Sequence, residues 1–491
     1  MPGQPRKLAR AGAIGPAAPS GSGPTAIVFA RATTAIRRKA ALISGDRFLP
    51  TVLKNVAHLL SGNAVALLLG VVSMGILARA LGPAGLGLIV LVESYGKMLN
   101  QLIKLETWQT FIRYGAIALE QGDRSRFLRL IKFGFALDIG LSAMSAVVCL
   151  LTASIAASLL GLSGEGVAMM QFYAIALVFG IGSTPLGILR IFDKFALIAW
   201  LDPIAAVLRL ALLALAFFLG ATAWTYLAII VFVLVAQRIL LSVVAYFVLR
   251  SEGYTGFLGE PLKGVAGENP GMLGMIVSSN FTILLRKSTQ EVDVLAVGAF
   301  LGPAAAGIYQ IARKLGYALQ KAGGTLQQVS FPHLARLWAR RDIEPFKKLV
   351  RQIEAMTLAG ALACSVMLVF LAEPVVLLIA GRDYLDATVP LIIHSLATLA
   401  LLCGSALRPA LANMGLQTRI LMATALSVSV FYATIVVAVP RFGIAGASIA
   451  HLVANAIMLP AIVLLYSRAL RREAQDQQRS DQPVPPARPA E

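Results

Sequence analysis

Two stretches of the chain, "ARALGPAGLGLIVLVESYGKM" at residues 78–98 and "GAFLGPAAAGIYQIARKLGYA" at residues 298–318, share one pattern. At an offset of 220, the following pairs coincide: Leu81 and Leu301, Gly82 and Gly302, Pro83 and Pro303, Gly87 and Gly307, Gly96 and Gly316. Proline cannot continue a helical hydrogen-bond ladder, and glycine accepts unusual dihedral angles, so each Gly-Pro pair ends one helix and turns the chain. The sequence therefore predicts two copies of one helical unit.

Both copies lie in a strongly apolar chain. Of its 491 residues, 58% are hydrophobic and 14% are charged, which is too apolar for an ordinary soluble protein. A helix needs roughly 20 apolar residues to cross a bilayer. The apolar runs predict twelve membrane helices near 56–79, 85–108, 130–159, 168–190, 196–219, 224–249, 272–300, 304–328, 355–380, 387–412, 418–439 and 443–467. The expected fold class is an all-α polytopic membrane protein.

The repeat predicts how these helices are organised. Each half holds six predicted spans, so both copies enter the membrane in the same orientation and the repeat is parallel. Such an architecture favours a transporter with a central cavity between two lobes. The predicted parts are a disordered basic tail at 1–50, an N-lobe at 51–250, a cytoplasmic loop at 251–271, a C-lobe at 272–468 and a disordered tail at 469–491.

The net charge of +19 comes from basic residues that flank the apolar runs. They form no basic domain, so we expect membrane lipids and no nucleic acid as partners. Because most of these cations fall on loops of one side, the positive-inside rule places both termini in the cytoplasm. The three cysteines lack the spacing of a disulfide or metal site, and no cofactor or metal is expected.

Charged residues inside the predicted spans are the candidate functional residues, because a charge at bilayer depth is costly unless it is paired or meets water. On the second predicted span Glu93, Lys97 and Lys104 share one helical face. The eighth carries Arg313 and Lys321 on a matching stripe. We expect both faces to line one interior.

The seventh predicted span contains "RKSTQEVD", residues 286–293. Arg286 and Asp293 share one face of it, whereas Lys287 and Glu291 share another and can neutralise each other as an intrahelical pair. At 1.5 Å per residue, Arg286 falls near the middle of the membrane. We expect Arg286 and Asp293 to meet the substrate and Lys287 and Glu291 to be structural.

Six cations outnumber three carboxylates in this candidate interior, so it should attract an anion, such as a phosphate-bearing substrate or a soluble metabolite. The predicted substrate contacts are Arg286, Lys97 and Lys321 first, then Arg313, Lys104 and Lys287. The predicted groups for ion coupling or for holding Arg286 are Asp293, Glu93 and Glu291. Asp202 and Arg209 form either a packing ion pair or part of a transport path. For the scattered histidines His58, His333, His394 and His451, a proton-relay role is the less favoured interpretation.

Several motifs resemble the lipid-linked oligosaccharide flippases of the multidrug/oligosaccharidyl-lipid/polysaccharide exporter superfamily, over residues 55–467. They are "LARALGPAGLG" with "FIRYG", "VDVLAVGAFLGPAAAGIYQIARKL", "LAEPVVLLIAGRDYLDATVPLIIHSLATL", "LANMGLQTRI" and "VPRFGIAGASIAHLVAN". The N-terminal tail of about 50 residues has no counterpart in that family.

The resemblance implies a V-shaped pair of six-helix lobes in the bacterial inner membrane that alternate between inward- and outward-open states. The implied substrate is an oligosaccharide on polyprenyl pyrophosphate, moved to the periplasmic leaflet for exopolysaccharide, capsule or O-antigen (lipopolysaccharide) synthesis. It also implies use of the membrane potential or an ion gradient. A polysaccharide polymerase or export complex is a further expected partner.

Four other functions are alternatives to an oligosaccharide flippase for a polytopic membrane chain. A multidrug or organic-cation antiporter would need an acidic, aromatic cavity, and a peptidoglycan lipid precursor flippase often has two more helices. A membrane scaffold would not explain charges on three repeat-related spans. An enzyme would need a soluble domain or a large outer loop, and the sequence has no P-loop, so the chain is predicted not to be an enzyme.

Overall fold

The computed structural model describes the backbone of residues 48–480 and its side chains, except those of residues 48–64, 282, 286, 322–333, 474 and 476–480. From Val56 onward the described helices belong to one compact unit. The first half of the chain holds α2 (Phe48–Ile103), α3 (Trp108–Glu120), α4 (Arg124–Leu159), α5 (Gly164–Val178), α6 (Ser183–Ile191), α7 (Phe195–Phe218) and α8 (Ala223–Ser251).

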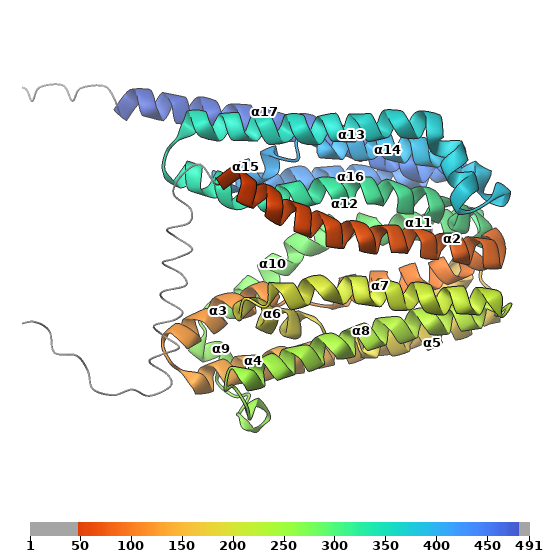
Figure 1. Ribbon diagram of the computed structural model, residues 1–491, viewed down its shortest axis with the longest axis horizontal. Helices are drawn as coiled ribbons and strands as arrows, with labels where there is room; N and C mark the ends of the chain where they lie inside the picture. The colour runs from red at the N-terminus through yellow and green to blue at the C-terminus, as the bar shows by residue number, and fades with distance from the viewer. Residues whose placement is uncertain (1–47, 481–491) are drawn as a thin grey trace, which may run out of the picture. The chain divides into compact units, whose positions relative to one another are not determined.

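A linker, residues 252–271, contains the short helices η1 (Phe257–Gly259) and α9 (Val265–Glu268). The second half then holds α10 (Met272–Lys287), α11 (Thr289–Leu301), α12 (Pro303–Ala339), α13 (Ile343–Ile379), η2 (Arg382–Ala387), α14 (Thr388–Leu402), α15 (Leu407–Asn413), α16 (Gln417–Phe442) and α17 (Ala445–Ser480). The described helices pack with near neighbours in the chain: α4 with α5 and α7 with α8 in the first half, α12 with α13 and α14, and α17 with α14 and α16, in the second (Figure 1).

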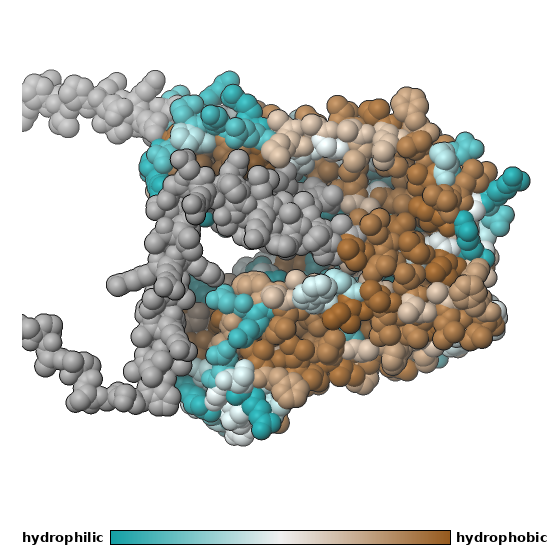
Figure 2. Space-filling view, in the orientation of Figure 1, coloured by the Kyte–Doolittle hydropathy of each residue, from teal (hydrophilic) through white to brown (hydrophobic). Residues whose placement is uncertain are grey.

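The predicted membrane class is confirmed. Nine helical stretches of the described residues are long and apolar enough to cross a membrane. Figure 2 shows hydrophobic residues covering the flanks of these helices, whereas hydrophilic residues gather toward their ends. The number twelve and the side of the termini stay predictions.

Several predicted spans are interrupted. The first two lie on α2, which the structure kinks at Gly82, and the second ends at Ile103 instead of residue 108. The seventh is divided at Ser288 into α10 and α11, although Ser288 keeps helical backbone angles of φ −56° and ψ −32°. The fourth and tenth are likewise divided, at residues 179–182 and 403–406. Hydropathy alone could not show these breaks.

The two Gly-Pro turns have the same geometry. Gly82 has φ 64° and ψ 178°, and Gly302 has φ 87° and ψ 174°. These angles lie in a region open mainly to glycine, which explains why that residue occupies both positions. The local structure of the repeat is therefore the same in both copies.

The two copies also meet each other. A Cβ on Gly87 would lie 1.7 Å from the carbonyl oxygen of Pro303, and a Cβ on Gly307 would lie 2.3 Å from that of Pro83. These contacts are reciprocal, as expected where two related units meet across a local two-fold axis. Only glycine allows α2 and α12 to approach so closely, as in small-residue packing of membrane helices.

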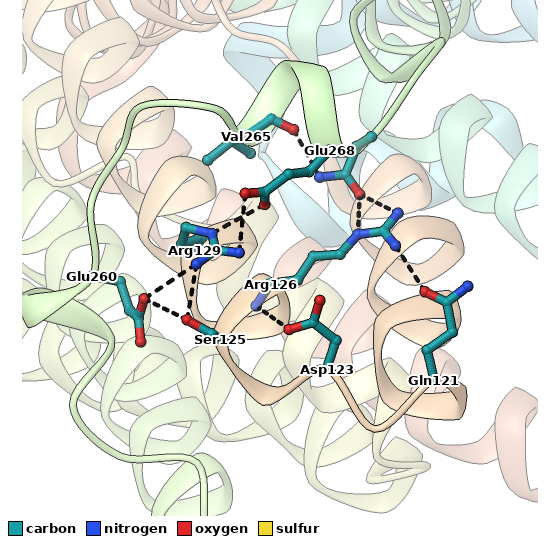
Figure 3. Close-up of polar contacts among 9 residues, drawn as sticks. Gln121, Asp123, Ser125, Arg126, Arg129, Glu260, Val265 and Glu268 are labelled. Atoms are coloured by element: carbon teal, nitrogen blue, oxygen red, sulfur yellow. Dashed lines mark hydrogen bonds and ion pairs between the residues drawn. The ribbon is translucent and has the colours of Figure 1, made fainter.

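The linker is attached to the start of α4 (Figure 3). Arg126 donates from Nε and Nη2 to Asn269 Oδ1 at 3.0 and 2.9 Å. Arg129 pairs with Glu268 at 3.0 Å, and its Nη1 lies 3.7 Å from Glu260 Oε2. These contacts hold the chain that connects the two halves against the first half.

Candidate functional site

The charged residues inside the predicted spans lie at similar depths along their helices. Glu93 and Arg313 each follow a Gly-Pro turn glycine by eleven residues, or about 16 Å of helix. Asp293 precedes Gly302 by nine residues, or about 13 Å. Because the apolar core of a bilayer is about 30 Å thick, helices that cross it from these turns place the three charges near its middle.

Asp293 is the centre of a cluster in the second half. Its Oδ2 atom is 3.2 Å from Arg313 Nε, 3.1 Å from His451 Nε2, and accepts a hydrogen bond from the Tyr309 hydroxyl at 3.0 Å. Glu291 completes this Asp293 cluster with an oxygen 3.6 Å from Arg313 Nη2. Asp293 is only 1% exposed, so its charge depends on these partners.

One predicted pairing was wrong here, that of Lys287 with Glu291, whereas the pairing of Asp293 with Arg286 stays a prediction. Asp293 is held by Arg313, and Glu291 also pairs with Arg313 and not with Lys287. The predicted partner Arg286 is on α10, but its side chain lies outside the described residues. Lys287 and Glu291 each meet an opposite charge from another segment of the chain, Glu106 for Lys287 and Arg313 for Glu291.

Lys287 instead pairs with the connection between α2 and α3. Its Nζ atom lies 2.5 Å from Glu106 Oε1. The backbone N–H of Glu106 donates to Asn280 Oδ1 at 2.6 Å, so this connection makes two contacts with α10. Beside it, the Arg190 guanidinium stacks on the Trp108 ring at 3.9 Å. The Lys287 and Asn280 contacts join the two halves of the chain, which no sequence spacing indicated.

A second cluster surrounds Glu93. Its carboxylate pairs with Lys97 at 2.8 Å and is close enough to Arg209 and Lys314 for attraction. No hydrogen bond or ion pair joins Arg209 or Lys314 to another described residue, and Arg209 Nε is buried without a partner. This Glu93 cluster therefore has three cations for one carboxylate.

Sequence reasoning missed Lys314 and left Arg209 undecided. Lys314 is the neighbour of Arg313 in the chain but lies off the predicted stripe, and its Nζ atom is 3.8 Å from the Cβ position of Gly70. For Arg209 the structure decides against the ion pair with Asp202, which instead accepts a hydrogen bond from Gln237 at 2.8 Å. An isolated cation in an apolar run was the signal for Arg209, whereas Lys314 directly follows another cation and had no such signal.

Two other predicted cations, Lys104 and Lys321, also have described side chains. Lys104, near the end of α2, donates to the carbonyl oxygen of Gly180. Lys321 lies further along α12 and is half-buried. The structure thus places six of the nine predicted residues in three ion-paired groups: Glu93 with Lys97, Lys287 with Glu106, and Arg313 with both Glu291 and Asp293.

With this arrangement established, the chain can be compared with known proteins. The family model described as "Polysaccharide biosynthesis protein" matches residues 52–338. The chain belongs to this family. It is 29% identical to the inner membrane protein YghQ of Escherichia coli K12 over 343 residues, which cover 69% of this chain and 94% of YghQ.

Solved structures show the fold. The lipid II flippase MurJ in an inward closed conformation matches with a TM-score of 0.67 at 13% identity, over 87% of this chain and 93% of that one. An inward-facing MATE multidrug transporter of the MOP superfamily matches with a TM-score of 0.61 at 14% identity, over 86% and 99%. The predicted superfamily is confirmed: the chain is a multi-pass membrane protein with the fold of flippase-type transporters.

Proposed function

We propose that this transporter flips oligosaccharides linked to polyprenyl pyrophosphate across the bacterial inner membrane by alternating access. In this proposal twelve membrane helices form two lobes of six, both termini are cytoplasmic, and the lobes correspond to residues 51–250 and 272–468. The product supplies exopolysaccharide, capsule or O-antigen synthesis, and a polymerase or export complex receives it.

The observation that carries the proposal is the cation excess of the Glu93 cluster. Gathering three cations around one buried carboxylate at this depth is unfavourable unless another anion completes the balance. A pyrophosphate offers several oxygens that lysine and arginine bind well. Membership of the polysaccharide biosynthesis family supports a lipid-linked sugar as the rest of the substrate.

The proposed phosphate contacts are Lys97, Arg209 and Lys314, and the predicted contacts Arg286 and Lys321 stay part of the proposal. Each hydrogen bond to a charged group contributes about 1.5 to 3 kcal/mol. Replacing Arg209 or Lys314 by methionine should therefore weaken substrate binding about 10- to 150-fold. Methionine keeps most of the side-chain volume, so the helices should still pack.

The test uses proteoliposomes with three probes: a polyprenyl-pyrophosphoryl oligosaccharide, lipid II and an organic cation. We expect flipping of the first probe, strongly reduced in Arg209→Met and Lys314→Met. Lys194→Met is the matched control, because Lys194 forms a partly exposed ion pair with Glu252 outside both clusters. Flipping of lipid II alone or export of the cation alone would refute the proposed substrate, as would full activity of both cavity variants.

A further inference from the structure

We propose that α3 and α6 form one mobile gate arm at the contact between the two halves, and that the carboxylate of Asp138 on α4 holds this arm in place. A chain of contacts runs from Asp138 through the starts of α6 and α3 to α10. The proposal concerns how the two halves part, so it does not depend on which substrate is carried.

The two helices of the gate arm are tied to each other. α3 and α6 pack side by side in the first half (Figure 1). The Arg190 guanidinium of α6 stacks on the Trp108 ring of α3, and the Trp108 backbone N–H donates to Ser183 Oγ at 2.9 Å. A Cβ on Gly187 of α6 would lie 2.8 Å from the Phe111 ring atom Cδ1. We therefore expect α3 and α6 to move as one body.

A break in the helical ladder precedes each helix of the gate arm. The chain leaves α2 at residues 104–107 and leaves α5 at residues 179–182. The two breaks lie side by side, because Lys104 Nζ donates to the carbonyl oxygen of Gly180. The buried apolar side chains of α3 and α6 also belong to a different cluster from those of α2 and α5. The arm can therefore tilt without unwinding α2 or α5.

Asp138 fixes the start of α6 against α4. It is 6% exposed, and its Oδ2 atom accepts the backbone N–H of Thr184 at 2.9 Å. The first N–H groups of a helix have no partner inside the helix, and a carboxylate is favourable at that end. One turn away on α4, a Cβ on Gly134 would lie 2.6 Å from Thr184 Oγ1, so only glycine leaves room for that side chain. Asp138 is thus a positioning residue for the arm.

Lys104 offers the Asp138 carboxylate a second partner. The Lys104 ammonium is close enough to attract Asp138, and it donates to the Gly180 carbonyl oxygen. A buried carboxylate is costly without a partner. When the arm moves and the Thr184 N–H leaves, the ammonium can replace it. The contact can therefore open without leaving an unpaired charge, as a switch between two arrangements requires.

The gate arm reaches the second half at the start of α3. The Glu106 side chain pairs with Lys287 of α10, and the Glu106 backbone N–H donates to Asn280 of the same helix. Trp108, two residues further on, is held by Ser183 at the start of α6. Because these contacts are contiguous, a shift of the α6 start changes the contact between the two halves.

The second half has the same carboxylate contact without the arm. Glu354 of α13 accepts the backbone N–H groups of Gly404 and Ala406, the second at 3.0 Å, at the break between α14 and α15. α5 and α14 each have 15 residues before their breaks. α12, however, continues unbroken past the level at which its repeat partner α2 ends, and α15 packs on α12, α16 and α17 of its own half. Glu354 is therefore a matched control for Asp138.

The first test follows hydrogen exchange by mass spectrometry in lipid nanodiscs without substrate. In Asp138→Ala, the backbone N–H groups at the starts of α3 and α6 should both exchange about 10- to 150-fold faster, because a hydrogen bond to a charged group is lost. Glu354→Ala should accelerate exchange at the start of α15 and leave the arm unchanged. Asp138→Asn keeps an acceptor oxygen, so it should show a smaller increase at the same places, and it replaces Asp138→Ala if that variant does not fold.

The second test measures the contact between the two halves. Glu106→Cys and Lys287→Cys are combined and joined by a short bifunctional thiol reagent, and each single variant is the control for the three native cysteines. The cross-linked fraction should fall severalfold when Asp138→Ala is added and stay unchanged when Glu354→Ala is added. Faster exchange at α6 with α3 unchanged would overturn the arm as one body. An unchanged cross-linked fraction in the Asp138 variant would overturn its role at the gate.

Discussion

Gly87→Ala is a direct test of the close approach between the two repeat units. The new Cβ would lie 1.7 Å from the Pro303 carbonyl oxygen, 2.5 Å from its carbonyl carbon and 3.2 Å from Gly307 N. All three atoms belong to the backbone, so no side chain can rotate away. The two helices must separate if the methyl group is to fit.

The expected size follows from these distances. A carbon normally stays about 3.4 Å from a carbonyl oxygen, so α2 and α12 must move apart by roughly 1.7 Å. Overpacking of this kind costs about 1 to 3 kcal/mol. Replacing glycine by alanine within a helix stabilises it by about 1 kcal/mol, which partly offsets that cost.

Gly140→Ala is the matched control, because Gly140 is inside α4 and no atom lies within 4 Å of its Cβ position. Both variants gain the same helix propensity, so the difference between them isolates the overpacking. In detergent, Gly87→Ala should unfold at a fixed temperature about 5 to 150 times faster than Gly140→Ala. Equal unfolding rates would show that α2 and α12 do not touch as described.

Three further predictions concern side-chain contacts. Reversing either charge of the Glu106 and Lys287 pair should destabilise the protein, and reversing both should restore its stability. The coupling energy should be about 0.2 to 1 kcal/mol, because the pair is partly exposed. A zero coupling energy in the double-mutant cycle would contradict the pairing. Tyr309→Phe should cost about 1 to 3 kcal/mol in thermal stability, because Asp293 is buried and loses a donor; an unchanged melting temperature would argue against that hydrogen bond. Arg129→Ala should loosen the linker and increase its rate of trypsin cleavage severalfold, although Arg126 still holds Asn269; an unchanged rate would contradict a stabilising role of the Arg129 contacts.

The pairing of Glu106 with Lys287 also bears on the alternating access that we propose. The connection between α2 and α3 contacts α10 there, and the two carboxylate and ammonium side chains are 37% and 39% exposed. Exposed ion pairs are weak, so such a contact can break at small cost when two halves of a transporter move apart. Asn280 adds a hydrogen bond to the Glu106 backbone that must break in the same step.

The sequence by itself determined the class of protein, most of the helices and the repeat. Hydropathy reports whether a helix can be buried in lipid, and that property belongs to each segment alone. The Gly82 and Gly302 turns were equally predictable, because Gly-Pro restricts backbone angles locally. The superfamily followed from the same ordered motifs.

Only the tertiary structure decided which charges meet. Asp293 and His451 are separated by 158 residues, and Glu106 and Lys287 by 181, so no helical spacing could connect them. Helical spacing alone predicted that the cations on these faces are available to bind an anion. In the folded chain Lys97, Arg313 and Lys287 instead form ion pairs with carboxylates. The physical reason is that a buried charge pairs with the nearest opposite charge in space. Which charges lie close together depends on how the helices pack and not on their positions in the sequence.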